Sequence, residues 1–252
     1  MKNVTATRCL CHYRVTPLIV VLMLLMAVTC FSAEKGYSNK VLADSINHDP
    51  AIKNLIAEAL AAEDAGNLPV SIELHKKVLE SQPKNVLSIN SIAGLYGVLE
   101  KFDEEAFWAK KAIEIDPNFD LAYINYANAM AQLGKIAEAK KAYEKAAELN
   151  PKSPIAFFNL GILAEQVRDI PQAIKYYKKS IVVDSKFESG YLNLAARYAN
   201  SKQFAEAIST LKKLLIINPK NADAREMLAD IERDKKRKEH KGTFFLGFTY
   251  SH

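Results

Sequence analysis

Cysteine is nearly absent from this chain of 252 residues, which contains only Cys9, Cys11 and Cys30. All three lie before residue 33, so the rest of the chain has no thiol for a disulfide, a metal site or nucleophilic catalysis. Acceptors for N-glycosylation are equally scarce, since the Asn-x-Ser/Thr pattern occurs once, at Asn3. These absences exclude a disulfide-stapled fold and cysteine chemistry beyond residue 32.

The sequence also lacks the common signatures of catalysis. It has no G-x-x-x-x-G-K-[ST] loop, no G-x-G-x-x-G turn and no G-x-S-x-G elbow. Its histidines form no H-E-x-x-H or comparable metal-ligand pattern; they are His12, His48, His75, His240 and His252. We therefore expect no enzymatic activity, no cofactor and no bound metal.

The net positive charge of the chain comes from its two ends. Of the net charge of +5, three charges belong to Lys2, Arg8 and Arg14, and residues 231–252 carry a further +3. The body between them is therefore close to neutral, at −1. A body without a general basic field predicts no nucleic-acid partner.

The amino terminus has the layout of an export signal. Basic residues precede an apolar run from Leu18 to Val28, and Cys30-Phe31-Ser32 offers small residues for cleavage. We interpret residues 1–32 as a signal peptide. With no later cysteine and no glycosylation acceptor, an exported chain fits a bacterial periplasm better than a eukaryotic secretory route.

Two alternatives for this segment stay open. Residues 15–33 contain no charge, and this length is close to the roughly 20 residues that span a bilayer, so the segment could stay uncleaved as an anchor. Acylation at Cys30 is the second alternative, although Ala27-Val28-Thr29 is a poor lipobox. The predicted location is thus periplasmic or secreted, with membrane anchoring as the alternative.

A proline recurs on one register of 34 residues, at Pro83, Pro117, Pro151 and Pro219, with Ser185 at the remaining step. Small and apolar residues recur with it. The clearest copy, residues 120–153, carries Tyr123, Tyr126, Ala127, Met130, Gly134, Ala139, Tyr143, Ala146 and Asn150-Pro151. These residues fit the spacing of W-x2-L-G-x2-Y…A-x3-F…P. The chain therefore resembles the tetratricopeptide repeat family.

Five copies of the pattern follow one another, at residues 52–85, 86–119, 120–153, 154–187 and 188–221. The first is the weakest, because Glu58, Ser71 and His75 stand where the family prefers leucine, alanine and an aromatic. In the second copy, Glu105 replaces a small residue. We expect His75 to be a packed or half-exposed side chain. Terminal repeats are commonly atypical, so the departures in the first copy agree with the resemblance.

Each copy predicts two helices, with an apolar stripe at intervals of three and four residues. Gly66 and Gly134 favour a turn between paired helices, and each closing proline ends one helix before the next begins. No single pair can bury its apolar face alone. We therefore predict an all-α, right-handed solenoid of five helix pairs.

The segments outside the repeats have their own expected roles. Residues 33–51 are a polar leader, and residues 222–240 predict a capping helix with Leu228 and Ile231 turned inward. Residues 241–252 form an aromatic, β-prone tail. This tail could add to a partner's sheet, occupy a groove, rest on a membrane, or fold back as a strand on the capping helix.

The resemblance implies a concave groove lined by the first helix of each repeat, with the fifth, sixth and ninth positions pointing into it. The sixth positions carry Asn125, Asn159 and Asn193, a ninth carries Asn128, and the fifth positions include Asn90, Ile124, Phe158 and Leu192. An amide offers both a donor and an acceptor to a peptide backbone. We expect the three apolar residues to form an exposed strip beside the amides. Alternatively, the asparagines hydrogen-bond within the repeat stack.

Lysine pairs recur in the second helices, at residues 76–77, 110–111, 178–179 and 212–213. They predict either a solvated face, partly paired with acids, or a basic stripe for lipid headgroups. From the groove we predict a non-catalytic scaffold or adaptor that binds extended peptide segments of partner proteins. The alternative is a membrane-tethered assembly factor, either a lipoprotein or signal-anchored, for an envelope secretion or pilus machine. Membrane contact would come from the leader or the tail.

Overall fold

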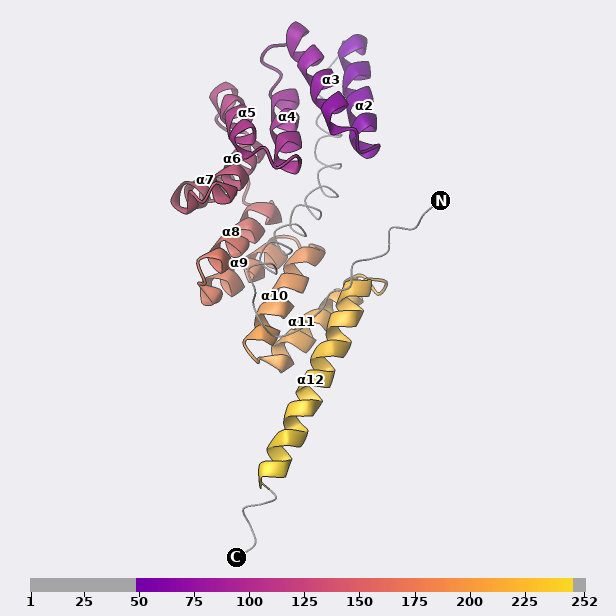
Figure 1. The fold of residues 1–252 in the computed structure, drawn as a ribbon, viewed down its shortest axis with the longest axis vertical. Coiled ribbons are helices and arrows are strands. Elements are labelled where there is room, and N and C mark those ends of the chain that lie inside the picture. The colour runs from indigo at the N-terminus through magenta and orange to yellow at the C-terminus, as the bar shows by residue number, and fades with distance from the viewer. Residues whose placement is uncertain (1–48, 247–252) are drawn as a thin grey trace, which may run out of the picture. The chain divides into compact units, whose positions relative to one another are not determined.

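The computed structural model describes residues 49–246, with side chains up to Arg237. This part of the chain contains eleven helices and no strand (Figure 1). In order they are α2 (Pro50–Asp64), α3 (Leu68–Ser81), α4 (Val86–Val98), α5 (Phe102–Ile115), α6 (Asp120–Gln132), α7 (Ile136–Leu149), α8 (Pro154–Gln166), α9 (Ile170–Val183), α10 (Glu188–Asn200), α11 (Phe204–Ile217) and α12 (Ala222–Leu246). Among these residues no helix is long and apolar enough to cross a membrane.

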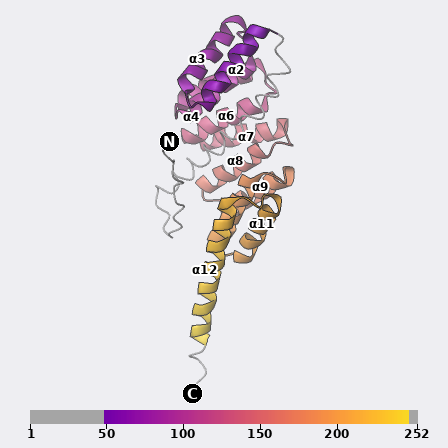
Figure 2. The same cartoon turned by 90° about the vertical axis from the view of Figure 1, so that its right-hand side faces the viewer.

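The first ten of these helices form five pairs, α2–α3 to α10–α11. Each helix packs against the next in the chain, and the pairs follow one another in sequence order (Figure 2). The predicted all-α solenoid of five helix pairs with a terminal capping helix is confirmed. Residues 1–48 and 247–252 lie outside the described residues, and so do the predicted signal peptide, Cys30 and the end of the aromatic tail.

The junction between pairs has the same backbone conformation in every repeat. The residue directly after each second helix has a φ between −128° and −131°, including Asp116 before Pro117 and Asn150 before Pro151. A proline keeps the preceding residue out of the helical region. Asp184 has the same φ of −131° although Ser185 follows it. Packing between neighbouring pairs therefore maintains the junction even where proline is missing.

The turn inside each pair places one residue in the left-handed region. These residues recur every 34 positions, and they are Gly66, Glu100, Gly134, Arg168 and Lys202, with φ between +57° and +75°. Glycine adopts this conformation without a steric penalty, whereas other L-residues pay roughly 1–2 kcal/mol for it. The predicted turns at Gly66 and Gly134 are confirmed, and three further repeats adopt the same turn without glycine.

The two helices of a pair approach closely at a small residue in the first helix. The equivalent residues in the last four repeats are Ala93, Ala127, Gly161 and Ala195, and all four are buried. A Cβ atom added at Gly161 would lie 2.5 Å from Cε1 of Tyr177, a fully buried ring of α9. In the fourth repeat even one methyl group would collide, so the helix separation depends on the missing side chain.

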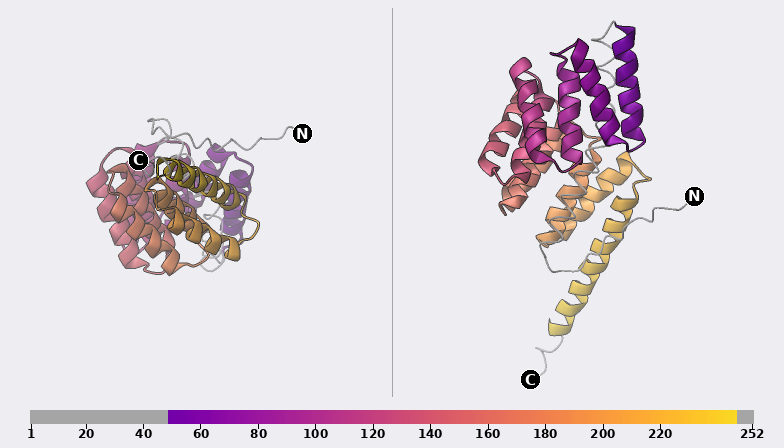
Figure 3. Two further views of the ribbon diagram at one scale, coloured as in Figure 1. Left: turned by 90° about the horizontal axis from the view of Figure 1, so that it is seen from below. Right: turned by 45° about the horizontal axis from the view of Figure 1, so that its top comes forward.

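The capping helix α12 packs on α11 and α10 at the end of the stack (Figure 3). Ala224 and Ile231 are buried there, and Met227 and Leu228 pack against the same cluster. The inward placement of Leu228 and Ile231 therefore agrees with the sequence. The helix continues to Leu246, beyond the expected end at residue 240, so the tail begins as helix rather than as strand. No proline interrupts this stretch, and a helix already formed extends at little cost.

Candidate protein-binding face

The first helices of the pairs, α2, α4, α6, α8 and α10, present one side of the stack, which we call the inner face. Asparagines join neighbouring helices along it. The Asn125 side-chain N–H donates to Oδ1 of Asn90 at 2.9 Å, which links α6 to α4. The Asn159 amide donates to Oδ1 of Asn128 at 3.3 Å, and the Tyr143 hydroxyl donates to the same oxygen at 2.6 Å. These amides therefore connect successive repeats.

Burial limits what these asparagines can offer to a ligand. The side chains of Asn90, Asn125 and Asn159 are buried, with exposed fractions of 5%, 3% and 9%. Asn193 is half-buried, and its amide donates to the Ser189 carbonyl at 3.0 Å inside α10. Hydrogen bonding within the stack thus occupies amide donors of Asn125, Asn159 and Asn193. Asn128 and Asn193 keep the greater exposure.

The expected exposed apolar strip is wrong for two of its three residues. Ile124 is 1% exposed and Phe158 is 7% exposed. The Phe158 ring lies between Tyr177 and Phe187, at centroid distances of 5.6 Å and 5.2 Å. Leu192 is half-buried and packs against the core of the last repeat. The fifth position therefore points between neighbouring helices, where it contributes to the hydrophobic core.

An ion pair lies between the last two repeats. The Arg197 Nε of α10 is 3.1 Å from Oε1 of Glu165 at the end of α8, and both side chains are mostly buried. Burial raises the pKa of the Glu165 carboxyl above its ordinary value of 4.5, and the attraction of Arg197 offsets this only in part. The Tyr177 hydroxyl lies close by, and its pKa is raised by burial and by the Glu165 charge.

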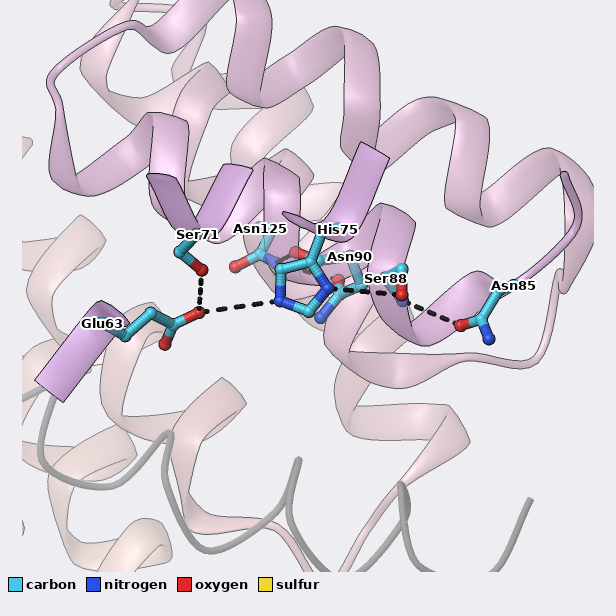
Figure 4. Close-up of polar contacts among 7 residues, drawn as sticks. All are labelled: Glu63, Ser71, His75, Asn85, Ser88, Asn90 and Asn125. Carbon is cyan, nitrogen blue, oxygen red and sulfur yellow. Dashed lines mark hydrogen bonds and ion pairs between the residues drawn. The ribbon is translucent and has the colours of Figure 1, made fainter. Parts of the chain in front are cut away.

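A network of polar side chains crosses the first repeat (Figure 4). The Ser71 hydroxyl donates to Oε1 of Glu63 at 3.2 Å, and Nε2 of His75 lies 3.8 Å from the same oxygen. On the other side of the ring, Nδ1 of His75 is 3.3 Å from the hydroxyl oxygen of Ser88. The Ser88 backbone N–H donates to Oδ1 of Asn85 at 3.0 Å. This polar network connects α2, α3 and α4.

Serine, histidine and glutamate are the residue types of a hydrolytic triad, but their burial here indicates a structural role. Ser88 and His75 are 1% and 2% exposed, so no substrate can reach them. Among residues 49–246, no group of three or more His, Cys, Asp or Glu side chains could hold a metal ion. The sequence marked Ser71 and His75 as departures, and His75 proves fully buried. Their connection through Glu63 and Ser88 was missed, although all four are polar at facing helical positions.

Comparison with known proteins agrees with this architecture. A family model for the TPR repeat matches residues 127–167, and a second, for the tetratricopeptide repeat, matches residues 108–141. The chain is a tetratricopeptide repeat solenoid. No curated protein matches the sequence significantly.

Several solved structures share the tetratricopeptide fold. PilW, described as a widely conserved type IV pilus biogenesis factor, has a TM-score of 0.63 at 21% identity, covering 81% of this chain and 96% of that chain. PilF of Pseudomonas aeruginosa has a TM-score of 0.61 at 20% identity, covering 74% of this chain and 91% of that chain. A thermophilic TPR protein of Thermus thermophilus has a TM-score of 0.62 at 17% identity, covering 71% of this chain and 98% of that chain. At these identities the likeness establishes the fold alone.

The raised pKa of Glu165 predicts a specific pH dependence of stability. The folded protein holds this proton more tightly than the unfolded chain, so the stabilisation is complete below pH 4.5 and is lost as the pH rises through the raised pKa. Relative to Glu165→Gln, the wild type should therefore lose free energy of unfolding as the pH rises from 4.5 through the raised pKa of Glu165. Urea titrations of both proteins from about pH 3 to about pH 8 measure the difference. A difference that stays constant, or that grows in favour of the wild type as the pH rises, would contradict the assignment.

Proposed function

We propose that this chain is a non-catalytic scaffold that binds extended peptide segments of partner proteins along its inner face, outside the cytoplasm. The observation that carries the proposal is an uncharged stripe on consecutive first helices. Its residues recur at intervals of four, three and four, which places them on one side of each helix. They are Leu121, Asn125, Asn128 and Gln132 on α6; Ile155, Asn159, Ile162 and Gln166 on α8; and Ser189, Asn193, Ala196 and Asn200 on α10.

The composition of this stripe suits a peptide better than a charged ligand. It combines amide side chains with apolar residues and one serine, and it contains no Lys, Arg, Asp or Glu. Most of its members outside the buried pair Asn125 and Asn159 are half-exposed. Amides can pair with the donors and acceptors of a peptide backbone, and the apolar residues can contact its side chains. An extended, partly apolar segment meets both requirements.

We assign different tasks to the asparagines on this face. Asn125, Asn159 and Asn90 hold adjacent repeats together, since they are buried and hydrogen-bonded across the stack. Asn128 and Asn193 are the more exposed amides, and we assign the side-chain N–H of Asn128 and Oδ1 of Asn193 to peptide backbone, since Oδ1 of Asn128 and the amide donor of Asn193 are already hydrogen-bonded within the stack. Ile162 is the apolar contact beside them, and Leu192 packs on the core behind the face. Ile124 and Phe158 support the face from the core.

A peptide selected from a random library on the full-length protein tests this assignment. Ile162→Ser combined with Asn193→Ala should weaken its binding by roughly tenfold, because one apolar contact and one amide pair are lost. Lys141→Ala, on an exposed position of α7, is the matched control and should bind as the wild type does. Fluorescence polarisation measures the three dissociation constants. Equal binding by all three proteins, or equal loss in the control, would reject the inner face as the site.

A membrane-tethered assembly factor is the second candidate function. It is favoured by the fold shared with the pilus proteins PilW and PilF, and by the signal-like leader with Cys30. In this case the scaffold would be attached to the envelope through an acylated cysteine or an uncleaved anchor.

Mass spectrometry of the mature amino terminus distinguishes the two candidates. An acyl group on Cys30, or an intact leader, supports tethering. A free amino terminus at Ala33 would show that the leader is cleaved and would remove this candidate, leaving the untethered scaffold.

A further inference from the structure

The second helices of the pairs expose one equivalent face, which we call the outer face. It consists of five exposed or half-exposed positions in each helix, at spacings of four, three, one and three residues. In the first three repeats these are Pro69, Glu73, Lys76, Lys77 and Glu80; Asp103, Phe107, Lys110, Lys111 and Glu114; and Ala137, Lys141, Glu144, Lys145 and Glu148. Each set contains two acids and two lysines, so its net charge is zero.

The last two repeats differ from this pattern. Their outer faces are Pro171, Lys175, Lys178, Lys179 and Val182 on α9, and Ala205, Ser209, Lys212, Lys213 and Ile216 on α11. These ten positions contain five lysines and no acid. The outer face therefore changes from neutral on α7 to strongly positive on α9 and α11. We call the ten outer-face positions of α9 and α11 the basic patch.

Local pairing strengthens the contrast between the two regions. In the first three repeats, Lys76 lies 2.8 Å from Glu73 and Lys145 lies 3.4 Å from Glu148, while Lys111 lies 4.9 Å from the ring centroid of Trp108. On α9, the neighbours of the lysines are rings: Lys178 lies 5.6 Å from the centroid of Tyr198, and Lys179 lies 4.0 Å from that of Phe157. A cation over a ring keeps its charge uncompensated. The basic patch can therefore attract an anionic surface.

Two apolar side chains project from the basic patch. Val182 is 81% exposed and Ile216 is 80% exposed, and they occupy the same position in consecutive repeats. The first three repeats carry Glu80, Glu114 and Glu148 at that position. Exposed apolar residues surrounded by lysines have the composition of surfaces that insert into a bilayer interface while the lysines contact headgroups.

We infer that the outer face of α9 and α11 docks on an anionic lipid bilayer. Lysine ammonium groups are mobile point charges without the fixed fork of arginine, and this suits many interchangeable headgroups better than one defined anion. The ten positions of the patch contain no Trp, Tyr or Arg, the residue types that carry most of the binding energy in protein–protein interfaces, so their composition favours a lipid surface over a protein partner. This site is separate from the inner face and does not rest on peptide binding there.

Vesicle sedimentation of the full-length protein tests the inference. The leader could bind any bilayer, so the measured quantity is the ratio of binding to phosphatidylglycerol vesicles over binding to phosphatidylcholine vesicles. Val182→Glu combined with Ile216→Glu restores the residue type of the first three repeats and should lower this ratio by roughly tenfold or more. Replacing Lys175, Lys212 and Lys213 with Gln should lower it as well while leaving both apolar residues in place.

The matched control is Val70→Glu combined with Val167→Glu, which exchanges two exposed valines outside the patch for acids. It should keep the ratio of the wild type. All substituted residues are exposed, and circular dichroism checks that each variant stays folded. An equal loss in the control, or a wild type without preference for phosphatidylglycerol, would overturn the inference. The inference would also be overturned if the wild type bound an acidic protein at the patch and showed no preference for phosphatidylglycerol vesicles.

Discussion

The structure depends on the close approach of paired helices at one small residue per repeat. In the fourth pair, Gly161 leaves space for the Tyr177 ring of α9, and no added methyl group would fit. Ala93, Ala127 and Ala195 occupy the same position in three other pairs and are fully buried. Because the register repeats every 34 residues, this spacing sets both the packing within pairs and the surface that the stack presents.

The same approach brings side chains of the second helices to the residues of the first helices. His75, Tyr143 and Tyr177 occupy one register position in α3, α7 and α9. They lie beside Glu63, Asn128 and Glu165 respectively. Side chains of the second helices therefore contact these polar residues of the first helices and fix their positions. Asn128, the one amide among them, is fixed in this way by the Tyr143 hydroxyl, and a preorganised side chain loses little conformational entropy on binding a ligand.

The two surfaces of the stack differ in charge because the helices contribute different positions to them. The inner stripe of α6, α8 and α10 is uncharged, whereas the outer face carries lysines in every repeat and loses its acids in the last two. A single period thus produces one surface suited to peptides and another suited to anionic lipid. A scaffold with both could hold a partner protein at a membrane.

The sequence predicted the helix pairs, the glycine turns and the cap, because each follows from local spacing. It did not predict that Phe158 and Ile124 are buried. Helical position indicates which side a residue lies on, but burial depends on how closely the next helix covers it. Asn125 illustrates the same limit, since its partner Asn90 is 35 residues away. The β-branched and aromatic residues after Lys241 suggested a strand, and the adjoining helix overrode that propensity up to Leu246.

The free energy of unfolding of Gly161→Ala tests the central constraint most directly. In an exposed helix this substitution stabilises by about 1 kcal/mol, because alanine is the better helix former. The close contact with Tyr177 predicts the opposite sign, a loss of about 1–3 kcal/mol in a urea titration. A gain of stability would show that the helices can separate freely at this position, and would contradict the requirement for a small residue there.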